Sequence, residues 1–371
     1  MSAAFIIAAM IASVLAITAM ALLFCRLRKL PRLTTEIDRA APSISIIIPA
    51  RNEESNLQRL LPSINQQSLA ACEVIVVDDH SEDRTAAVAE SHQCRVIRGK
   101  DLPDGWFGKP WACQQGAEAA TGELLFFLDA DVELQPSALA RLAATASASP
   151  SAVISVCPWH RIESPYEELS VFFNLLMVGG IGAFTYRADQ AKGIGLFGQT
   201  LLIPRKLYHD IGGHESVKKT VLENLHLAGE LEKRGIERLC YLGKGSISMR
   251  MFPEGFGELT ASWKKGFSSG AGLTSTFAMT LCILWLIGLM ALAMIALMLP
   301  LGGPAAIPWV LGCYLAVAIT LIILFRQVGR FSCWSALLFP IPLFFYQGLF
   351  ASALIHKKKG GTTQWKGRDV A

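Results

Sequence analysis

The sequence predicts an α/β domain that is joined to membrane-spanning helices on both sides. The chain of 371 residues is 52% hydrophobic and only 17% charged, with a mean hydropathy of +0.40, which is too apolar for an ordinary soluble protein. Its apolar residues gather in a run from Ala3 to Phe24 and in a nearly charge-free stretch from Phe277 to Ile355. Between them, short β-rich runs alternate with helical patterns, which is typical of a largely parallel sheet.

Residues 1–25 are expected to form an N-terminal transmembrane anchor, because about 20 apolar residues suffice to cross the hydrocarbon core. No small-residue cleavage site follows this run, so we expect the anchor to be retained. Four positive residues follow it, namely Arg26, Arg28, Lys29 and Arg32. Since positive residues favour the cytoplasmic side, the sequence predicts a multi-pass protein of the cell membrane whose middle domain is cytoplasmic.

The cysteines argue against a disulfide-rich or zinc-binding protein, and the net charge argues against a nucleic-acid-binding one. Nine cysteines, an odd number without a CxxC pair, predict neither a disulfide framework nor a zinc site and fit a reducing compartment. The net charge of +4 is small and spread along the chain, so we expect no nucleic-acid partner. The basic clusters lie at the edges of the membrane segments, where attraction to anionic membrane lipid explains them.

The alternation of strands and helices defines a domain that we expect to span residues 43–270. Strands and helix starts are expected at 44–49, Glu53, 73–77, Glu82, 95–98, Lys109, 123–128, after Pro136 and at 152–157. The apolar stretch Leu169–Tyr186 contains three glycines, so we expect it to lie on the membrane or to line a groove rather than to span. A second α/β part is expected from Gly198 to about Phe267.

The C-terminal region, residues 277–355, is expected to contain about three apolar segments, followed by a basic cytoplasmic tail at 356–371. If all three segments crossed the membrane, Arg326 would lie inside while the basic tail would lie outside, which conflicts with the charge rule. Pro340 and Pro342 would permit a re-entrant or broken last helix. We favour this arrangement because it returns the tail to the cytoplasm.

Acidic residues follow two of the predicted strands. Asp79 follows the second strand, and Asp129 and Asp131 follow the fourth. Parallel sheets bind ligands beyond the carboxyl ends of their strands, so we expect these carboxylates to share one site. Their oxygens suit Mg²⁺ or Mn²⁺, which bridge protein carboxylates and phosphates. In the alternative interpretation, Asp79 or Ser81 only caps the next helix.

Three segments, IIIPARNEE, VVDDHSEDRT and FLDADV, resemble in order and spacing the glycosyltransferase family 2 enzymes, which have the GT-A fold of nucleotide-diphospho-sugar transferases. The resemblance covers about residues 43–270. It implies an inverting, metal-dependent transfer of a sugar from a nucleotide-sugar donor, in the first place a UDP-sugar, with Mg²⁺ or Mn²⁺ as cofactor. It assigns residues to the nucleotide and to the metal as follows: Pro49, Arg51, Glu53, Asp79 and Asp129 to the nucleotide, and Asp129 and Asp131 to the metal.

A glycine- and tryptophan-rich loop, Leu102–Ala112, opens a helix between these segments. A helix N-terminus with a lysine is a natural phosphate site, and Lys109 stands there. The segment narrows the resemblance to family members that act on carotenoid, apocarotenoid-acid (diaponeurosporenoate-type) or hopanoid lipids. This implies that Lys109 binds the nucleotide diphosphate and that the acceptor is lipid-soluble. For Trp106 and Trp111, filling gaps in the core is the alternative role.

The position of the general base is unusual. In the family a helix normally starts Glu-Asp, and the aspartate deprotonates the acceptor hydroxyl, whereas this chain has Glu223 followed by Asn224. An amide cannot take the proton. Three interpretations remain: Glu223 serves as the base, the acceptor is a carboxylic acid that is already ionised near neutral pH, or the protein is inactive.

The resembling members suggest the second interpretation, in which glucose from UDP-glucose is esterified to an apocarotenoid acid. Transfer to a polyprenyl phosphate or a glycolipid, and a non-catalytic nucleotide-sugar-binding membrane protein, remain as alternatives. A QxxRW motif is absent at 258–267, which argues against a processive polymerase, and Trp263 there is expected to anchor the chain at the membrane. For His214 and His226, a turn or surface position is the alternative to a catalytic role.

Overall fold

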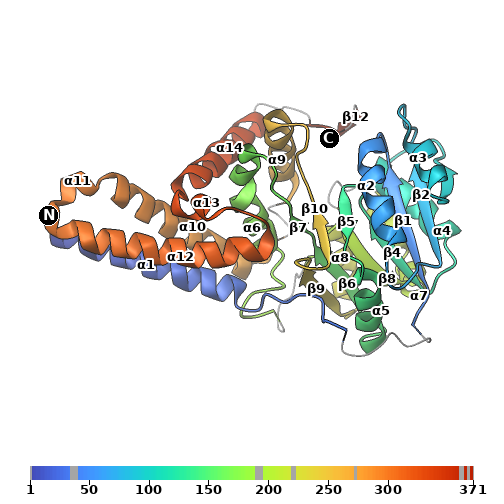
Figure 1. Cartoon of the computed structure of the whole chain (residues 1–371), viewed down its shortest axis with the longest axis horizontal. Helices are drawn as coiled ribbons and strands as arrows, with labels where there is room; N and C mark the ends of the chain where they lie inside the picture. Colours follow the sequence, from blue (N-terminus) through green and yellow to red (C-terminus); the bar gives the residue numbers. More distant parts are fainter. Residues whose placement is uncertain are drawn as a thin grey trace. The chain divides into compact units, whose positions relative to one another are not determined.

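The computed structural model describes residues 2–33, 41–188, 195–218, 223–270, 274–358, 363–365 and 368–370. The chain forms two compact units, which interleave along the sequence. The sheet unit comprises Arg28–His160 and Gly195–Met251, and the helical unit comprises Met1–Leu27, Arg161–Ile194 and Phe252–Ala371. The predicted α/β fold, with apolar helices before and after it in the sequence, is confirmed (Figure 1).

The sheet unit is built on a seven-stranded sheet with the order β3-β2-β1-β4-β8-β6-β9. Its strands are β1 (Ile44–Ala50), β2 (Glu73–Asp78), β3 (Arg95–Arg98), β4 (Leu124–Leu128), β6 (Val153–Cys157), β8 (Thr200–Pro204) and β9 (Arg238–Leu242). Six strands run in one direction, and β8 runs antiparallel between β4 and β6. The predicted, largely parallel sheet is therefore correct, with β8 as the exception.

Helices connect and cover these strands. They are α2 (Glu54–Asn65), α3 (Thr85–Ser91), α4 (Gly108–Ala119), α5 (Ala138–Ala148), α7 (Arg205–Asp210), the 3-10 helix η2 (Gly213–Val217) and α8 (Glu223–Lys233). The helix expected from Glu82 begins only at Thr85, because Asp83 Oδ1 accepts a hydrogen bond from the Thr85 amide at 2.9 Å. Ser81 Oγ instead accepts from the Asn52 amide at 3.0 Å, so the capping alternative for Ser81 is wrong.

The packing of α4 against β1 and β2 determines where the N-terminus of α4 lies. β1 and β2 are almost completely buried, and each fully buried Ile or Val side chain contributes roughly 1.5–3 kcal/mol. An added Cβ at Gly116 would lie 2.4 Å from Cγ2 of Ile47, so glycine is required for α4 to approach β1 this closely. This packing brings the N-terminus of α4, with Lys109, to the carboxyl edge of the sheet.

A second, three-stranded sheet begins directly after Asp131, the second carboxylate of the predicted metal pair. Its strands are β5 (Val132–Leu134), β10 (Ile247–Met249) and β7 (Trp159–His160), in the order β5-β10-β7. β5 pairs antiparallel with β10, with Val132 opposite Met249. The backbone is therefore held immediately after Asp131.

The segment that follows the first helix is bound along the edge of the large sheet. The Leu242 amide at the end of β9 donates to the carbonyl of Arg28 at 2.8 Å. The buried guanidinium of Arg141 on α5 donates to the Pro31 carbonyl at 2.9 Å and also to the Leu30 carbonyl. Arg141 thus satisfies backbone carbonyls of this segment that no regular ladder would pair.

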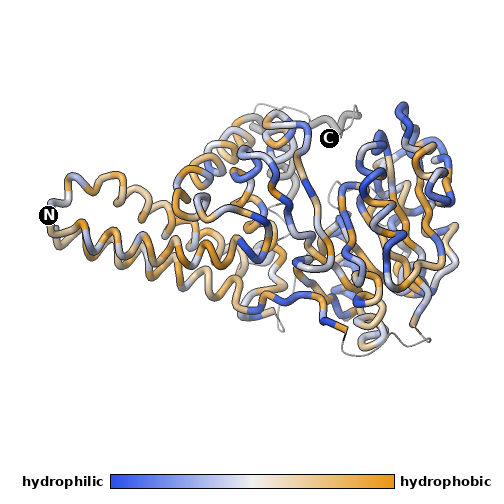
Figure 2. The backbone as a smooth tube through the Cα atoms, in the orientation of Figure 1, coloured by the Kyte–Doolittle hydropathy of each residue, from blue (hydrophilic) through white to orange (hydrophobic). Residues whose placement is uncertain are grey.

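Among its described residues, the helical unit contains three helices that are long and apolar enough to cross a membrane, within Ser2–Phe24, Thr276–Leu297 and Pro304–Val328. Its elements are α1 (Ser2–Phe24), η1 (Pro165–Ser170), α6 (Val171–Gly180), α9 (Phe256–Gly270), α10 (Thr276–Leu297), α11 (Leu299–Gly302), η4 (Pro304–Ala306), α12 (Ile307–Val328), α13 (Cys333–Leu337) and α14 (Pro340–Lys358). A hairpin pairs β11 (Thr363–Trp365) with β12 (Arg368–Val370). Figure 2 shows α1, α10 and α12 as mostly hydrophobic, as expected of a membrane protein.

α1 and α10 pack closely and antiparallel. Near one end, Phe24 stacks edge-on against Trp285 with ring centroids 5.6 Å apart, and near the other end an added Cβ at Gly302 would lie 3.0 Å from the Phe5 ring. Between them, an added Cβ at Gly288 would lie 2.7 Å from the backbone nitrogen of Ala16. Small residues at this crossing let the two backbones approach, as is typical of membrane helices.

The charged residues lie at one end of this bundle. α12 returns from the Gly302 end, and its Phe325 ring lies 5.8 Å from Phe172, which in turn lies 5.7 Å from Trp285. Arg26 and Arg326 therefore lie at the same end of the bundle. The opposite end, near Gly302, is formed by residues 2–5 and 298–307, and these residues include no Asp, Glu, Lys or Arg.

The last apolar segment is broken between α13 and α14. α14 packs mainly on α9, η1 and α6, and its Tyr346 ring lies 4.9 Å from that of Phe173. α6 itself has only ten residues, which is too short to span, and seven of them are buried. α10, α12 and α14 pack on α6 and cover most of its apolar side chains, and its place on the membrane or along a groove stays a prediction.

Candidate active site

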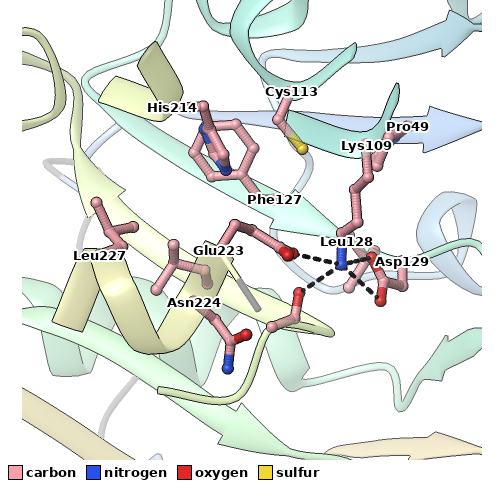
Figure 3. Close-up of a pocket in the computed structure, with 12 residues that line it drawn as sticks. Pro49, Lys109, Cys113, Phe127, Leu128, Asp129, His214, Glu223, Asn224 and Leu227 are labelled. Carbon is pink, nitrogen blue, oxygen red and sulfur yellow. Dashed lines mark hydrogen bonds and ion pairs between the residues drawn. The ribbon is translucent and has the colours of Figure 1, made fainter. Parts of the chain in front are cut away.

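A pocket opens at the carboxyl edge of β1 and β4, within the sheet unit (Figure 3). Its walls come from β1, α4, β4, the turn before β8, η2 and α8. The lining residues are Pro49, Lys109, Cys113, Phe127, Leu128, Asp129, Gly198, Leu201, His214, Glu223, Asn224 and Leu227. The fold therefore brings together five of the predicted site residues, namely Pro49, Lys109, Asp129, Glu223 and Asn224.

Lys109 lies at the centre of the charged part of this pocket. Its Nζ is 2.8 Å from Asp129 Oδ1, 3.1 Å from Glu223 Oε1 and 3.2 Å from the Gly198 carbonyl oxygen, as Figure 3 shows. Burial alone would lower the pKa of Lys109, but the carboxylates of Asp129 and Glu223 hold this pKa well above its usual value. Lys109 is therefore a permanent positive charge near the N-terminus of α4 rather than a base.

Asp131 has an environment that suits a cation. Its Oδ1 is buried and accepts no hydrogen bond from any residue that the structure describes. Burial, followed by the negative charges of Asp129 and Glu53, raises the pKa of Asp131 to about 7. A divalent cation would relieve this repulsion and supply the missing partner, so Asp129 and Asp131 fit a Mg²⁺ or Mn²⁺ site.

Protein side chains alone would not complete such a metal site. Within the described ranges, no group of three or more His, Cys, Asp or Glu side chains is arranged to hold a metal ion. Mg²⁺ typically binds one or two carboxylates together with substrate phosphates. The donor set thus fits a metal that binds together with a diphosphate.

The remaining predicted nucleotide residues lie at the ends of β1 and β2. The Asp79 amide donates to the Ala50 carbonyl at 2.8 Å, and Asp79 Oδ2 forms an ion pair with Arg51 Nη1 at 3.7 Å. Glu53 Oε2 accepts a hydrogen bond from the Asn56 side chain at 2.6 Å. These contacts place Arg51 and Asp79 together at the carboxyl edge of the sheet.

Asn224 is held as a hydrogen-bond donor. Its Nδ2 donates to the carbonyl of Leu196, and its Cγ would lie 3.2 Å from an added Cβ at Gly198. A carboxylate here would face a carbonyl oxygen without a proton between them, so the local structure suits an amide. The sequence gives no sign of this contact, because its partners are 28 residues apart.

The two histidines differ in position. His214 is buried, its Nδ1 lies 2.9 Å from the Tyr208 hydroxyl, and its ring packs edge-on against Phe127. Burial, with a smaller contribution from Lys109, lowers the pKa of His214 to about 3, so it is neutral and supports the pocket wall. His226 is exposed on α8.

The glycine- and tryptophan-rich loop packs beside Lys218, which follows η2. The Trp106 and Trp111 rings lie 5.0 Å apart, and Lys218 Nζ lies 5.7 Å from the Trp106 ring centre. The Phe107 amide donates to the Lys218 carbonyl at 3.1 Å. Both tryptophans are half-buried, so they are not simply core residues.

Gly198 is a site residue that sequence reasoning left without a role. Its carbonyl accepts from Lys109, and a side chain there would press on Asn224. The only sequence signal is a glycine placed just before a strand.

Comparison with known proteins agrees with this geometry. Residues 45–212 match the family described as glycosyl transferase family 2. The chain is 34% identical over 355 residues to 4,4'-diaponeurosporenoate glycosyltransferase of Staphylococcus aureus strains USA300 and MRSA252, covering 95% of this chain and 94% of the relative.

A mannosyltransferase from Pyrobaculum calidifontis, solved in complex with GDP-Man and Mn²⁺, has the same fold. The two chains are 18% identical with a TM-score of 0.51, and the superposition covers 95% of each. The chain is therefore a glycosyltransferase with the GT-A fold, and it belongs to glycosyl transferase family 2.

Proposed function

We propose that this enzyme transfers a hexose from a nucleotide-sugar to the carboxylate of a lipid-soluble acid and so forms a glycosyl ester. The observation that carries the proposal is Asn224, which occupies the position of the family's base but is bound as a donor to the Leu196 carbonyl. A carboxylate acceptor is already ionised near pH 7 and needs no base. The relative's name, which contains a carotenoid carboxylate, supports this acceptor class.

The reaction balances without a proton acceptor on the protein. A carboxylate oxygen of the acceptor attacks the anomeric carbon, the bond from this carbon to the diphosphate oxygen breaks, and the nucleoside diphosphate leaves with the bonding electrons. Attack opposite the leaving group inverts the anomeric carbon. The fixed charge of Lys109 stabilises the departing diphosphate.

The donor is proposed to be UDP-glucose, with its nucleoside bound by Pro49, Arg51, Glu53 and Asp79 and its diphosphate near Lys109 and Asp129. Asp129 and Asp131 would hold Mg²⁺ or Mn²⁺, which when bound supplies further neutralisation of the diphosphate charge. The neighbour solved with GDP-Man and Mn²⁺ supports a nucleotide-sugar and a divalent metal as a pair.

The protein is proposed to act from the cytoplasmic side of the cell membrane. The clustering of Arg26 and Arg326 at one end of the α1, α10 and α12 bundle supports this orientation, as positive residues favour the cytoplasm. We accordingly assign residues 1–25 to an anchor, 43–270 to the glycosyltransferase domain, 277–355 to the C-terminal membrane region and 356–371 to a cytoplasmic tail.

A second candidate is transfer to an alcohol with Glu223 as the base, because Glu223 Oε1 faces the pocket. This oxygen already forms an ion pair with the Lys109 ammonium at 3.1 Å, so it is not free to take the acceptor's proton, which disfavours this role.

The decisive experiment uses two acceptors that share one hydrocarbon chain, an apocarotenoid acid and the corresponding alcohol. Purified protein in lipid receives Mn²⁺ and radiolabelled UDP-glucose, with polyprenyl phosphate and diacylglycerol as further acceptors. We expect label in the acid, released by mild alkali as expected for an ester, and none with Asp131→Asn. Transfer to the alcohol that Glu223→Gln abolishes would establish the second candidate instead; donor binding without transfer to any acceptor would contradict both.

The variant Asn224→Asp tests the explanation directly. A carboxylate at this position can take a proton from a hydroxyl, so we expect new transfer to the alcohol acceptor and no gain with the acid. The melting temperature should fall, because the Leu196 carbonyl loses its donor, at a cost of about 1–3 kcal/mol. An increase in transfer to the acid would show that the wild-type enzyme lacks a base that it needs.

A further inference from the structure

Gln199 lies opposite Asp129 at the end of the ladder between β4 and β8. The ladder pairs Phe127 with Leu201 and Leu128 with Thr200, and the Asp129 amide donates to the Gln199 carbonyl at 2.9 Å, which continues the pairing by one residue. Gln199 and Asp129 lie just beyond the strand ladder, and the neighbouring Gly198 and Leu201 line the pocket.

The carboxamide of Gln199 contains an acceptor atom to which the described residues donate no hydrogen bond. This atom, Oε1, is buried. A buried acceptor without a donor is unfavourable, and such groups in native proteins call for an explanation. A neutral hydroxyl group can supply the missing proton, whereas the oxygens of a diphosphate bring only lone pairs.

The turn that carries Gln199 is fixed on both sides. Asn224 donates to the Leu196 carbonyl, and Lys109 donates to the Gly198 carbonyl at 3.2 Å. The Phe197 amide donates to Ser155 Oγ at 2.7 Å. The carboxamide is thus presented from a rigid support, as is typical of a group that orients a ligand.

We propose that Gln199 Oε1 accepts a hydrogen bond from a hydroxyl group of the transferred sugar and thereby takes part in selecting the donor sugar. The inference rests on the nucleotide-sugar donor proposed above. In the proposed donor complex Asp129 lies at the diphosphate, so the adjoining sugar ring is the part of the donor that brings hydroxyl groups near Gln199. Gln199 is a specificity-determining residue and takes no part in bond making or breaking.

The test compares UDP-glucose with its 2-, 3-, 4- and 6-deoxy analogues in the wild-type enzyme and in Gln199→Leu. Affinity for each donor is measured with Mn²⁺ and without acceptor, and kcat/KM is measured with the acid acceptor. We expect the wild type to lose roughly tenfold against one deoxy donor, the size of one neutral hydrogen bond. Gln199→Leu should lose the same factor with UDP-glucose and should no longer distinguish it from that deoxy donor.

The melting temperature of Gln199→Leu distinguishes a ligand-binding role of Gln199 from a structural one. Leucine removes an unpaired buried acceptor, so the melting temperature of Gln199→Leu should be unchanged or higher, although donor affinity falls. The exposed Gln66 at the end of α2 provides the matched control, since Gln66→Leu should alter neither property.

Three outcomes overturn the inference. The first is a Gln199→Leu variant that keeps the wild-type discrimination among all deoxy donors. The second is a shift in the Mn²⁺ concentration for half-maximal binding with unchanged discrimination, which would place Gln199 on the metal. The third is a wild type that binds all five donors equally. Failure of sugar transfer with normal donor discrimination would contradict the proposed function and leave this inference standing.

Discussion

The charge arrangement around Lys109 illustrates how single residues determine this site. One ammonium lies within 3.1 Å of two carboxylates, Asp129 and Glu223, which come from opposite walls of the pocket. Removing one partner of a partly buried charge cluster costs more than the pair contributes, because the remaining charges lose their compensation. Lys109 therefore joins the two walls of the pocket and, in the proposed mechanism, provides positive charge for the donor.

Replacing Lys109 by Met should lower kcat about 10²–10³-fold, the usual effect of removing one group that stabilises developing charge. The reason is loss of the fixed charge beside the leaving diphosphate. The measurement is steady-state transfer of labelled glucose, with Lys100→Ala as control, since the Lys100 side chain is exposed. Wild-type turnover in Lys109→Met would contradict the assigned role.

A buried histidine predicts how stability depends on pH. His160 is 2% exposed, neither ring nitrogen has a hydrogen-bond partner among the described residues, and burial lowers its pKa to about 4. The unfolded chain binds a proton below about pH 6.5, and the folded protein does so only below about pH 4. Stability is therefore full above pH 6.5 and falls between pH 6.5 and 4, by roughly 3 kcal/mol for this group.

His160→Leu should flatten this part of the profile of melting temperature against pH. His226→Leu, which changes an exposed histidine, should leave the profile unchanged. His214, with a pKa of about 3, contributes in the same direction, so some slope should persist in the first variant. Equal slopes for wild type and His160→Leu would contradict the lowered pKa of His160 in the folded protein.

Residues at strand ends could be predicted from the sequence, whereas contacts between distant loops could not. Asp79, Asp129 and Pro49 follow runs of buried strand residues, so their meeting at one edge follows from parallel strand order alone. The Asn224 contact with Leu196 and the position of Gln199 opposite Asp129 depend on β8, the antiparallel strand. No local pattern in the sequence indicates that reversal.

Among the elements, the crossing of α1 and α10 shows where packing leaves no room. An added Cβ at Gly288 would meet backbone atoms of α1, 2.7 Å from Ala16 N and 2.9 Å from Ala12 O, and backbone cannot move aside as a flexible side chain can. In α12, by contrast, nothing lies within 4 Å of an added Cβ at Gly312. The two glycines form a matched pair within membrane helices.

Gly288→Leu should destabilise the protein in detergent by at least 1–3 kcal/mol, roughly the cost of overpacking. Gly312→Leu should be nearly neutral, since its position is open. Thermal unfolding of both variants, followed by the loss of monodisperse protein, provides the measurement. Equal melting temperatures would contradict the close α1 and α10 contact.

Element boundaries were predicted well where the signal was periodic and poorly where side chains compete with the backbone. α3 begins at Thr85 rather than at the expected Glu82, because Asp83 Oδ1 accepts a hydrogen bond from the Thr85 amide and holds the preceding residues in a turn. The expectation for Leu169–Tyr186 rests on its apolar residues and its three glycines, and neither feature tells whether lipid or protein covers a helix. The structure gives α6 a protein cover, within the helical unit.

At the scale of the whole molecule, the charge distribution predicts membrane topology. We expect the Arg26 end of the bundle to be cytoplasmic and Ser2 to face outward. In a variant whose other cysteines are serine, exposed Cys333 should resist a membrane-impermeant maleimide in intact cells and react after lysis. Ser2→Cys, in a chain without other cysteines, should react in intact cells; the reverse pattern would invert the topology.

The interleaving of the two units along the chain governs how the protein can be divided. Residues 161–194 interrupt the sheet unit and contribute α6, whose apolar side chains are covered by α10, α12 and α14. A fragment of residues 43–270 would keep α6 but lack α10, α12 and α14. The apolar side chains of α6 would then be exposed and would promote aggregation. We therefore expect the sheet unit and the apolar helices to be produced as a folded protein only together.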